Sequence, residues 1–128
     1  MSRDSMNIDR IVGPGDVLQT YPIGTYTRLV TSTTASALFT PSGSKVFLVY
    51  HYHIVRVGSG TNNLQVRSAA TNIGIFNPGA AGAHPAFASS VIPLLIGRAV
   101  GEALNLAVSA ADTILVTMTV GEGTVRGV

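Results

Sequence analysis

Apolar and polar residues alternate with a period of two over most of the chain, which is the pattern of a half-buried β-strand. The clearest segment is residues 45–57, KVFLVYHYHIVRV. Alternation places five apolar or aromatic side chains of this segment on one face: Val46, Leu48, Tyr50, Tyr52 and Ile54. The other face is mixed, so both faces are expected to be largely covered. Residues 58–63, GSGTNN, have the composition of a turn, and residues 64–70 alternate again. This pattern predicts a β-hairpin over residues 45–70.

A second hairpin is predicted near the end of the chain, from residues 103–108 and 113–120 around the turn SAAD. Shorter strands are predicted over residues 26–34, 36–39, 73–76 and 91–96. Val, Ile and Thr together number 37 of the 128 residues, and these β-branched types favour strands over helices. No segment has the pattern of an amphipathic helix. We therefore expect an all-β fold, an antiparallel β-sandwich that is jelly-roll-like.

Two segments fall outside the expected strands. Residues 1–24 hold five of the 14 charged side chains and are interrupted by Gly-Pro-Gly at 13–15, which predicts an extended N-terminal arm ahead of a sandwich domain at 25–128. Residues 77–90, NPGAAGAHPAFASS, carry no charge and are rich in small residues. Long loops of this kind in a compact domain are often functional, so this one is a candidate contact surface, with a flexible surface loop as the alternative.

Charge is scarce, and its scarcity suggests that part of the surface is covered. Charged residues make up 11% of the chain, against about 25% in ordinary soluble domains. Lysine, which is depleted at protein interfaces, occurs once, as Lys45, whereas arginine occurs seven times. A small Ser- and Thr-rich monomer is the alternative. No basic cluster with interleaved aromatics is present, so nucleic acid is not an expected partner.

Membrane and secretion signals are also missing from the sequence. Residues 1–13 lack the apolar core of a secretory signal, so no leader is expected. The longest uncharged stretch, residues 68–97, is interrupted by prolines and glycines, so no membrane span is expected.

Residues for catalysis or metal binding are few. There is no cysteine, and the sequence has no nucleophile elbow, phosphate-binding loop or zinc-protease motif. His51 and His53 share one strand face, a spacing that can give two metal ligands, but two ligands do not complete a site. A half-buried pair of histidines or a pairing face between subunits is the alternative explanation. The sequence therefore predicts no enzyme activity, no metal site and no cofactor. A hydrolase would require Glu102 or Glu122 to meet a histidine in a pocket.

The segment YHYHIVRVGSGTNNLQVRSAATNIG, the small-residue loop after it, and GEALNLAVSAADTILVTMTVGEG together resemble small jelly-roll-like capsid decoration, or cement, proteins of tailed bacteriophages. The likeness spans residues 45–120. It implies a non-enzymatic virion protein, made in the host cytoplasm and bound to the exterior of the capsid. It also implies the major capsid protein as partner and self-association into a homotrimer or a dimer. Such a subunit would stabilise the assembled head by bridging coat subunits.

Two sets of contact residues follow from this interpretation. The capsid-contact candidates lie in the arm: Arg3, Asp9, Arg10, Val17, Leu18 and Tyr21. The subunit-contact candidates are aromatic residues and histidines: Tyr50, His51, Tyr52, His53 and Phe87. The alternative function is a phage receptor-binding or fibre-tip β-sandwich that presents residues 77–90 to a host glycan or protein.

Overall fold

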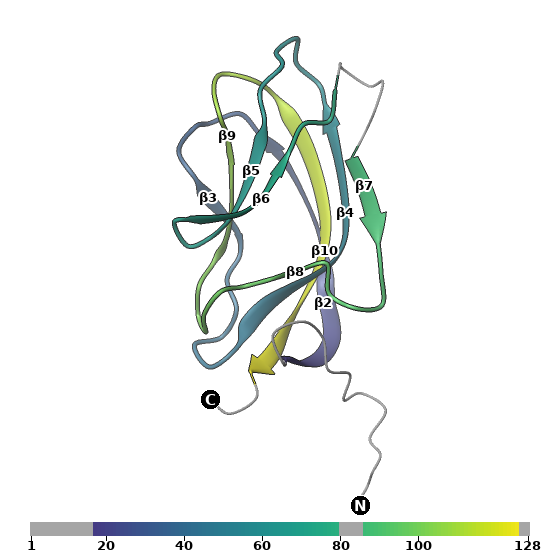
Figure 1. Ribbon diagram of the computed structural model, residues 1–128, viewed down its shortest axis with the longest axis vertical. Helices are drawn as coiled ribbons and strands as arrows, with labels where there is room; N and C mark the ends of the chain where they lie inside the picture. The colour runs from purple at the N-terminus through teal and green to yellow at the C-terminus, as the bar shows by residue number, and fades with distance from the viewer. Residues whose placement is uncertain (1–16, 80–85, 126–128) are drawn as a thin grey trace, which may run out of the picture.

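The protein is a sandwich of two antiparallel β-sheets (Figure 1), as the sequence predicts. The computed structural model describes residues 17–79 and 86–125. The long sheet has the strand order β2-β10-β4-β7, with β8 also paired to β4. Its strands are β2 (Val17–Val30), β4 (Val46–Arg56), β7 (Ala86–Ser89), β8 (Leu95–Ile96) and β10 (Ile114–Val125). The short sheet has the order β3-β9-β5-β6. Its strands are β3 (Ser36–Phe39), β5 (Leu64–Ser68), β6 (Thr71–Phe76) and β9 (Leu104–Val108).

The strands pair in a nested order that makes the sandwich a jelly roll. The two-residue turn at Ala69 and Ala70 joins β5 to β6, and Ala69 takes the left-handed conformation there, with φ of 52°. Outward from this turn, β4 pairs with β7 and β8, β3 pairs with β9, and β2 pairs with β10. The chain is thus one long antiparallel ribbon rolled so that alternate pairs fall in opposite sheets.

The two predicted hairpins are wrong, although the strands themselves are present. β4 belongs to the long sheet and β5 to the short sheet, and β9 and β10 are divided in the same way. Alternation specifies which side chains of a strand are buried, but it does not specify the partner strand. The segments after β4 and β9 therefore cross from one sheet to the other where a hairpin would have turned back within one sheet.

The core lies between the sheets, and a bulge in β4 changes which of its residues face it. The register of β4 against β10 shifts between Thr119 and Val120, which leaves Tyr50 as an extra residue. Phe47 and Val49 therefore face the core on one side of the bulge, and Ile54 faces it on the other. Val46, Leu48 and Tyr50 form a second buried cluster with Ile96 and Val100. The single continuous face predicted for β4 is thus divided in two.

The strand boundaries also move the expected domain limit. β2 begins at Val17, so residues 17–24, expected in the arm, pair with the end of β10 as part of the long sheet. Residues 1–16 lie outside the described residues. In the predicted loop at 77–90, residues 86–89 form the edge strand β7. Within the described part of the chain, no helix has the length and hydropathy needed to cross a bilayer.

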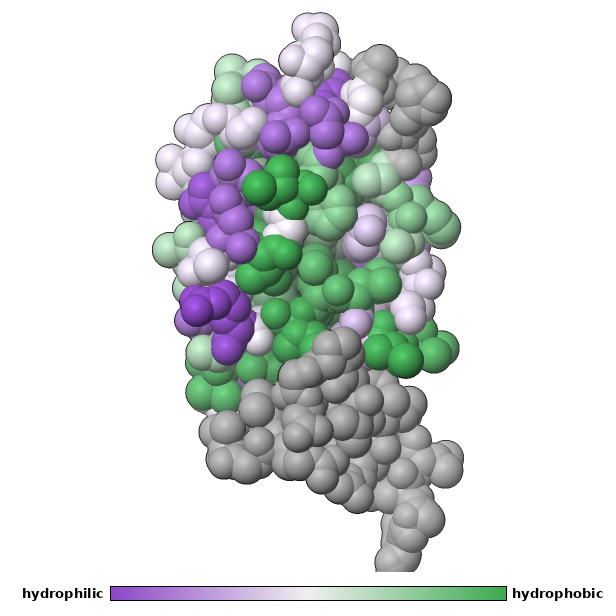
Figure 2. Space-filling model, in the orientation of Figure 1, coloured by the Kyte–Doolittle hydropathy of each residue, from purple (hydrophilic) through white to green (hydrophobic). Residues whose placement is uncertain are grey.

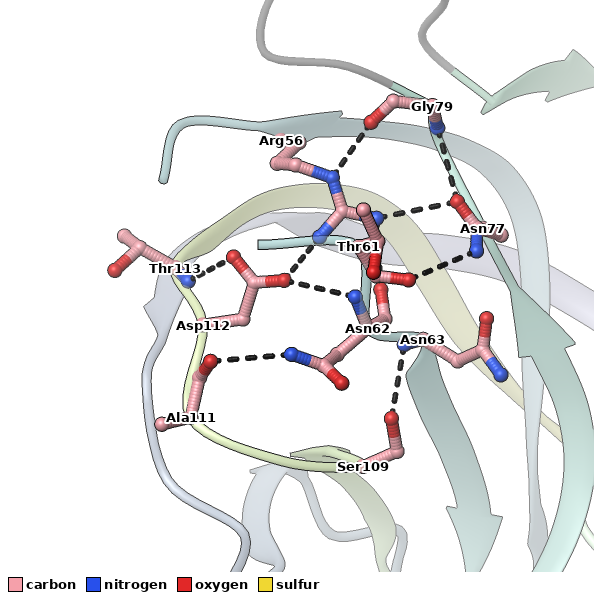
Figure 3. A network of polar contacts seen from close by, with 10 residues as sticks. All are labelled: Arg56, Thr61, Asn62, Asn63, Asn77, Gly79, Ser109, Ala111, Asp112 and Thr113. Atoms are coloured by element: carbon pink, nitrogen blue, oxygen red, sulfur yellow. Dashed lines mark hydrogen bonds and ion pairs between the residues drawn. The ribbon is translucent and has the colours of Figure 1, made fainter. Parts of the chain in front are cut away.

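Three crossings between the sheets meet at one end of the sandwich, around the buried side chain of Arg56 (Figure 3). Its guanidinium donates to the carbonyl of Asn62 at 2.7 Å and to the side chain of Asn77 at 3.1 Å. It also donates to the carbonyl of Gly79 at 2.6 Å and pairs with the carboxylate of Asp112. The network ties the segments that follow β4, β6 and β9, so its role is to hold the end of the jelly roll together.

Asp112 is held as a carboxylate in this network. Its side chain is fully buried and accepts hydrogen bonds from the backbone N–H groups of Asn62, at 3.1 Å, and Thr113, at 2.8 Å. Burial alone would raise the pKa of Asp112. The two backbone donors and the guanidinium of Arg56 outweigh burial, so the pKa of this carboxyl lies below its ordinary value.

Candidate interaction surface

The outer face of the long sheet carries an ordered array of side chains without a single charge. Three rows cross the strands in register. The residues, row by row, are Thr25, Thr119, His51 and Ser89; Thr27, Thr117, His53 and Phe87; and Leu29, Leu115 and Val55. These eleven positions, called the outer face below, alternate with the core residues of the same strands, so their side chains point away from the short sheet.

The polar groups of the outer face bond along the rows. The hydroxyls of Thr25 and Thr119 lie 2.9 Å apart, and those of Thr27 and Thr117 lie 3.2 Å apart. Such threonine pairs stabilise neighbouring strands and hold the hydroxyls in fixed positions. They also engage the hydroxyls of the threonines with one another.

His51, His53 and Phe87 form an aromatic cluster at the β7 side of the outer face. The ring of Phe87 makes edge contacts with His51, at a centroid distance of 5.4 Å, and with His53, at 6.0 Å. Phe87 is 62% exposed, which is a large apolar exposure for a side chain on a short edge strand. Phenylalanine is among the residue types enriched in protein interfaces.

The outer face of the short sheet has the opposite character. Arg67 donates there to the side chains of Asn72, at 2.9 Å, and Gln65, at 2.6 Å. Asn105, on the neighbouring strand β9, donates to the carbonyl of Ala69 at 2.9 Å. Charged and amide groups bonded to one another are typical of a solvent-facing sheet. The two faces of the sandwich are therefore distinct in chemistry.

Hydrophobic residues are also exposed along the open edge between the two sheets. Figure 2 shows hydrophobic residues gathered over β6 and β8, with hydrophilic ones along the short-sheet side. Ile75 on β6 is 59% exposed, and Val91, between β7 and β8, is 80% exposed. Exposed apolar side chains gathered beside an uncharged sheet face are typical of contact surfaces.

The structure brings together three of the five subunit-contact candidates: His51, His53 and Phe87. Tyr52 points to the core, where its ring lies 4.8 Å from that of Phe76, and Tyr50 is buried in the second cluster. The bulge and the strand alternation account for this division. The threonines of the array were not singled out from the sequence, although the repeats Thr25-Tyr-Thr27 and Thr117-Met-Thr119 were a visible signal.

Three of the six capsid-contact candidates lie outside the described residues: Arg3, Asp9 and Arg10. Val17, Leu18 and Tyr21 occupy the first half of β2, opposite the last residues of β10. Their positions in an edge strand differ from the extended arm that the sequence predicted.

Glu102 and Glu122, the residues that a hydrolase would require, are engaged in hydrogen bonds that hold loops. Glu102 accepts from the hydroxyl of Ser68 at 2.6 Å, and Glu122 accepts from the backbone N–H of Ser42 at 2.7 Å. Glu122 pairs with Phe47, four residues before His51, which is about 13 Å along the strand. Among residues 17–79 and 86–125, no three His, Cys, Asp or Glu side chains gather as metal ligands.

Comparison with known proteins adds no relative: no family model, no curated protein and no solved structure matches this chain. Its fold and its surfaces are therefore the basis for a functional interpretation.

Proposed function

We propose that the protein is a capsid decoration, or cement, subunit of a tailed bacteriophage. It binds the exterior of the assembled head through the major capsid protein, associates with copies of itself and stabilises the shell by bridging coat subunits. The observation that carries this proposal is the charge-free outer face of the long sheet. The resemblance of residues 45–120 to decoration proteins supplies the identity of the partner.

An uncharged, rigid sheet face suits protein contact because the centre of a protein interface is depleted in charged residues. Threonine hydroxyls paired across strands lose little side-chain freedom on contact. The exposed ring of Phe87 adds apolar area that contact would remove from water. The network around Arg56 stiffens one end of the sandwich, so the face is presented by a fixed scaffold.

The size of the outer face also fits a multivalent role. Four strands about 4.8 Å apart and three rows about 6.6 Å apart cover about 400 Å². A stable one-to-one interface needs about 800 Å² on each partner. One outer face alone therefore makes a weak contact, and a shell that repeats the same site many times converts such contacts into avidity.

Heads of the phage that encodes the chain, assembled without this protein, provide the direct test. The full chain is added back, and bound protein is measured after the heads are sedimented. The variant Thr117→Arg places a charge at the centre of the outer face and is expected to lose binding. Ala37→Arg places the same charge at an exposed position of the short sheet, opposite Asn105, and is expected to bind as the wild type does. Equal binding of both variants, or no binding of the wild type, would overturn the proposal.

The N-terminal segment is tested with a deletion that respects the fold. Removing residues 1–24 would take away half of β2, whereas removing residues 1–16 leaves the strand complete. If the segment before β2 contacts the shell, the shorter deletion weakens head binding while the thermal unfolding of the sandwich stays unchanged.

A receptor-binding or fibre-tip module is the second candidate, and the exposure of Phe87 on β7 favours it, since this residue lies in the predicted contact loop. In that case the protein binds host cells and Phe87→Ala removes the binding. Deletion of residues 1–16 leaves host-cell binding intact. Binding to host cells without binding to heads would decide for this alternative.

A further inference from the structure

We propose that His51 and His53 form half of a binding site for a divalent transition metal such as zinc, nickel or copper, and that the same pair from a second copy of the chain completes it. A dimer built on this face covers the surface proposed to bind heads, so metal-bridged pairing and head binding exclude each other there. The test below uses no heads, so its failure is distinguishable from a failure of head binding. The inference rests on the position of the two imidazoles, on their lack of other partners and on the charge-free face around them.

The two histidines are placed as a chelating pair. They lie two residues apart on β4, opposite Thr119 and Thr117, so both side chains project from the outer face. Side chains at this spacing point the same way from a strand. Both are partly exposed, and the same ring, that of Phe87, contacts them both. The ring of Phe87 therefore limits the movement of the two imidazoles on the β7 side, while their solvent-facing side stays accessible.

Neither imidazole has a hydrogen-bond or ion-pair partner among the described residues. The hydroxyls of Thr117 and Thr119, opposite the pair on β10, are engaged with those of Thr27 and Thr25. Neutral imidazole nitrogens are common ligands of zinc, copper and nickel. The side chains of His51 and His53, which are partly exposed and not bonded to other described groups, are available to a metal ion.

The missing ligands must come from outside the single chain or from water. Zinc in structural sites takes four ligands, and the described residues supply no third metal-ligating side chain beside the pair. A second copy supplies two more imidazoles when two outer faces meet about a two-fold axis. In such a contact both copies use the same surface, so each contributes its His51 and His53.

The outer face tolerates a copy of itself because it carries no charge. A self-contact about a two-fold axis brings two copies of the same face together, so a face with charges of one sign would repel its own copy. Two sheets that stack face to face lie about 10 Å apart, and Zn–N bonds measure about 2.0–2.1 Å. Imidazoles from both sheets can therefore reach an ion midway between them. The metal also compensates for the small area of the face.

The experiment uses the full chain without an affinity tag. Zinc chloride is titrated into metal-free protein by calorimetry, and the molar mass is measured by light scattering with zinc and with EDTA. We expect one zinc per two chains and a doubling of the mass with zinc relative to EDTA. His51→Ala and His53→Ala should each abolish both effects. His84→Ala, which changes the third histidine of the chain, should retain both effects.

Several results would overturn the proposal: no zinc binding by the wild type, binding that persists in both single variants, or one zinc per chain without a change in mass. Both histidines project to solvent, so their replacement is expected to leave the core intact. Urea unfolding of each variant verifies this. As a second readout, the imidazole NMR signals of His51 and His53 should shift with zinc in His84→Ala. Unchanged signals would count against the site.

Discussion

Arg56 and Asp112 are 56 positions apart in the sequence, and their side chains form an ion pair that is almost fully withdrawn from water, with 1% and 0% of each exposed. Each partner also bonds to backbone groups of the crossing segments. A buried ion pair contributes little relative to an apolar pair of the same shape, but removing one partner leaves a buried charge without compensation. The pair therefore acts chiefly to specify which segments meet at this end of the sandwich.

Replacing Arg56 tests this role against an exposed arginine. Arg56→Met keeps an unbranched apolar stem but leaves the Asp112 carboxylate unpaired, so we expect it to lower the free energy of unfolding by about 3–5 kcal/mol. Arg98→Met removes an exposed arginine that donates to the hydroxyl of Thr71, and we expect a change within about 0.5 kcal/mol. Urea denaturation measures both, and equal midpoints for the two variants would contradict the prediction.

The lowered pKa of Asp112 predicts a specific loss of stability in acid. The folded state holds the carboxylate deprotonated to lower pH than the unfolded chain does. The stabilisation is therefore complete above the unfolded pKa of about 3.9 and is lost as the pH falls through the lower folded value. Unfolding free energies measured by urea between pH 2 and pH 6 should fall less steeply in Asp112→Asn than in the wild type. Parallel curves would show that another group controls the acid transition.

The strands were predictable because alternation depends on local sequence alone. β3 spans the four residues expected of it, and the alternation of residues 64–70, 103–108 and 113–120 identified three further strands, with ends that differ from the observed ones. Strand pairing was not predictable in this way. GSGTNN and SAAD have the composition of hairpin turns, yet Gly60 and Asp112 lie in crossings that the Arg56 network joins. Contacts between positions so far apart leave no local pattern.

The candidate surface was predictable in part. Alternation correctly identified the shared face of His51 and His53. It also placed Tyr52 on the opposite face, where the structure has it packed against Phe76, so Tyr52 was wrongly included among the surface contact candidates. One signal in the sequence pointed to the buried network. Arg56 continues the core side of β4 two positions after Ile54, and a charge at a core position requires a buried partner.

Burial raises the pKa of the Tyr50 phenol, so the protein should also lose stability in alkali. The folded state keeps this phenol protonated to higher pH than the unfolded chain. The stabilisation is therefore complete below the unfolded pKa of about 10 and is lost as the pH rises toward the folded value. Urea unfolding between pH 8 and pH 11.5 should show a smaller loss for Tyr50→Phe than for the wild type. Equal losses would mean that Tyr50 does not titrate differently in the two states.

Gly60 is required by its close approach to the carboxylate of Asp112. A Cβ atom at Gly60 would lie 2.5 Å from Oδ2 and 2.8 Å from Cγ of Asp112. Gly60→Ala must therefore displace the carboxylate from Arg56, and we expect a loss of about 1–3 kcal/mol in the free energy of unfolding.

Gly43 provides the control. No atom lies within 4 Å of the position that a Cβ atom would take at Gly43, and alanine there restricts the unfolded chain. We expect Gly43→Ala to be neutral or to stabilise the protein by up to about 1 kcal/mol. Thermal and urea unfolding of the two variants compare the sites directly. A Gly60→Ala protein as stable as Gly43→Ala would show that the three crossings can shift without loss, and that the Arg56 network does not hold this end of the sandwich rigid.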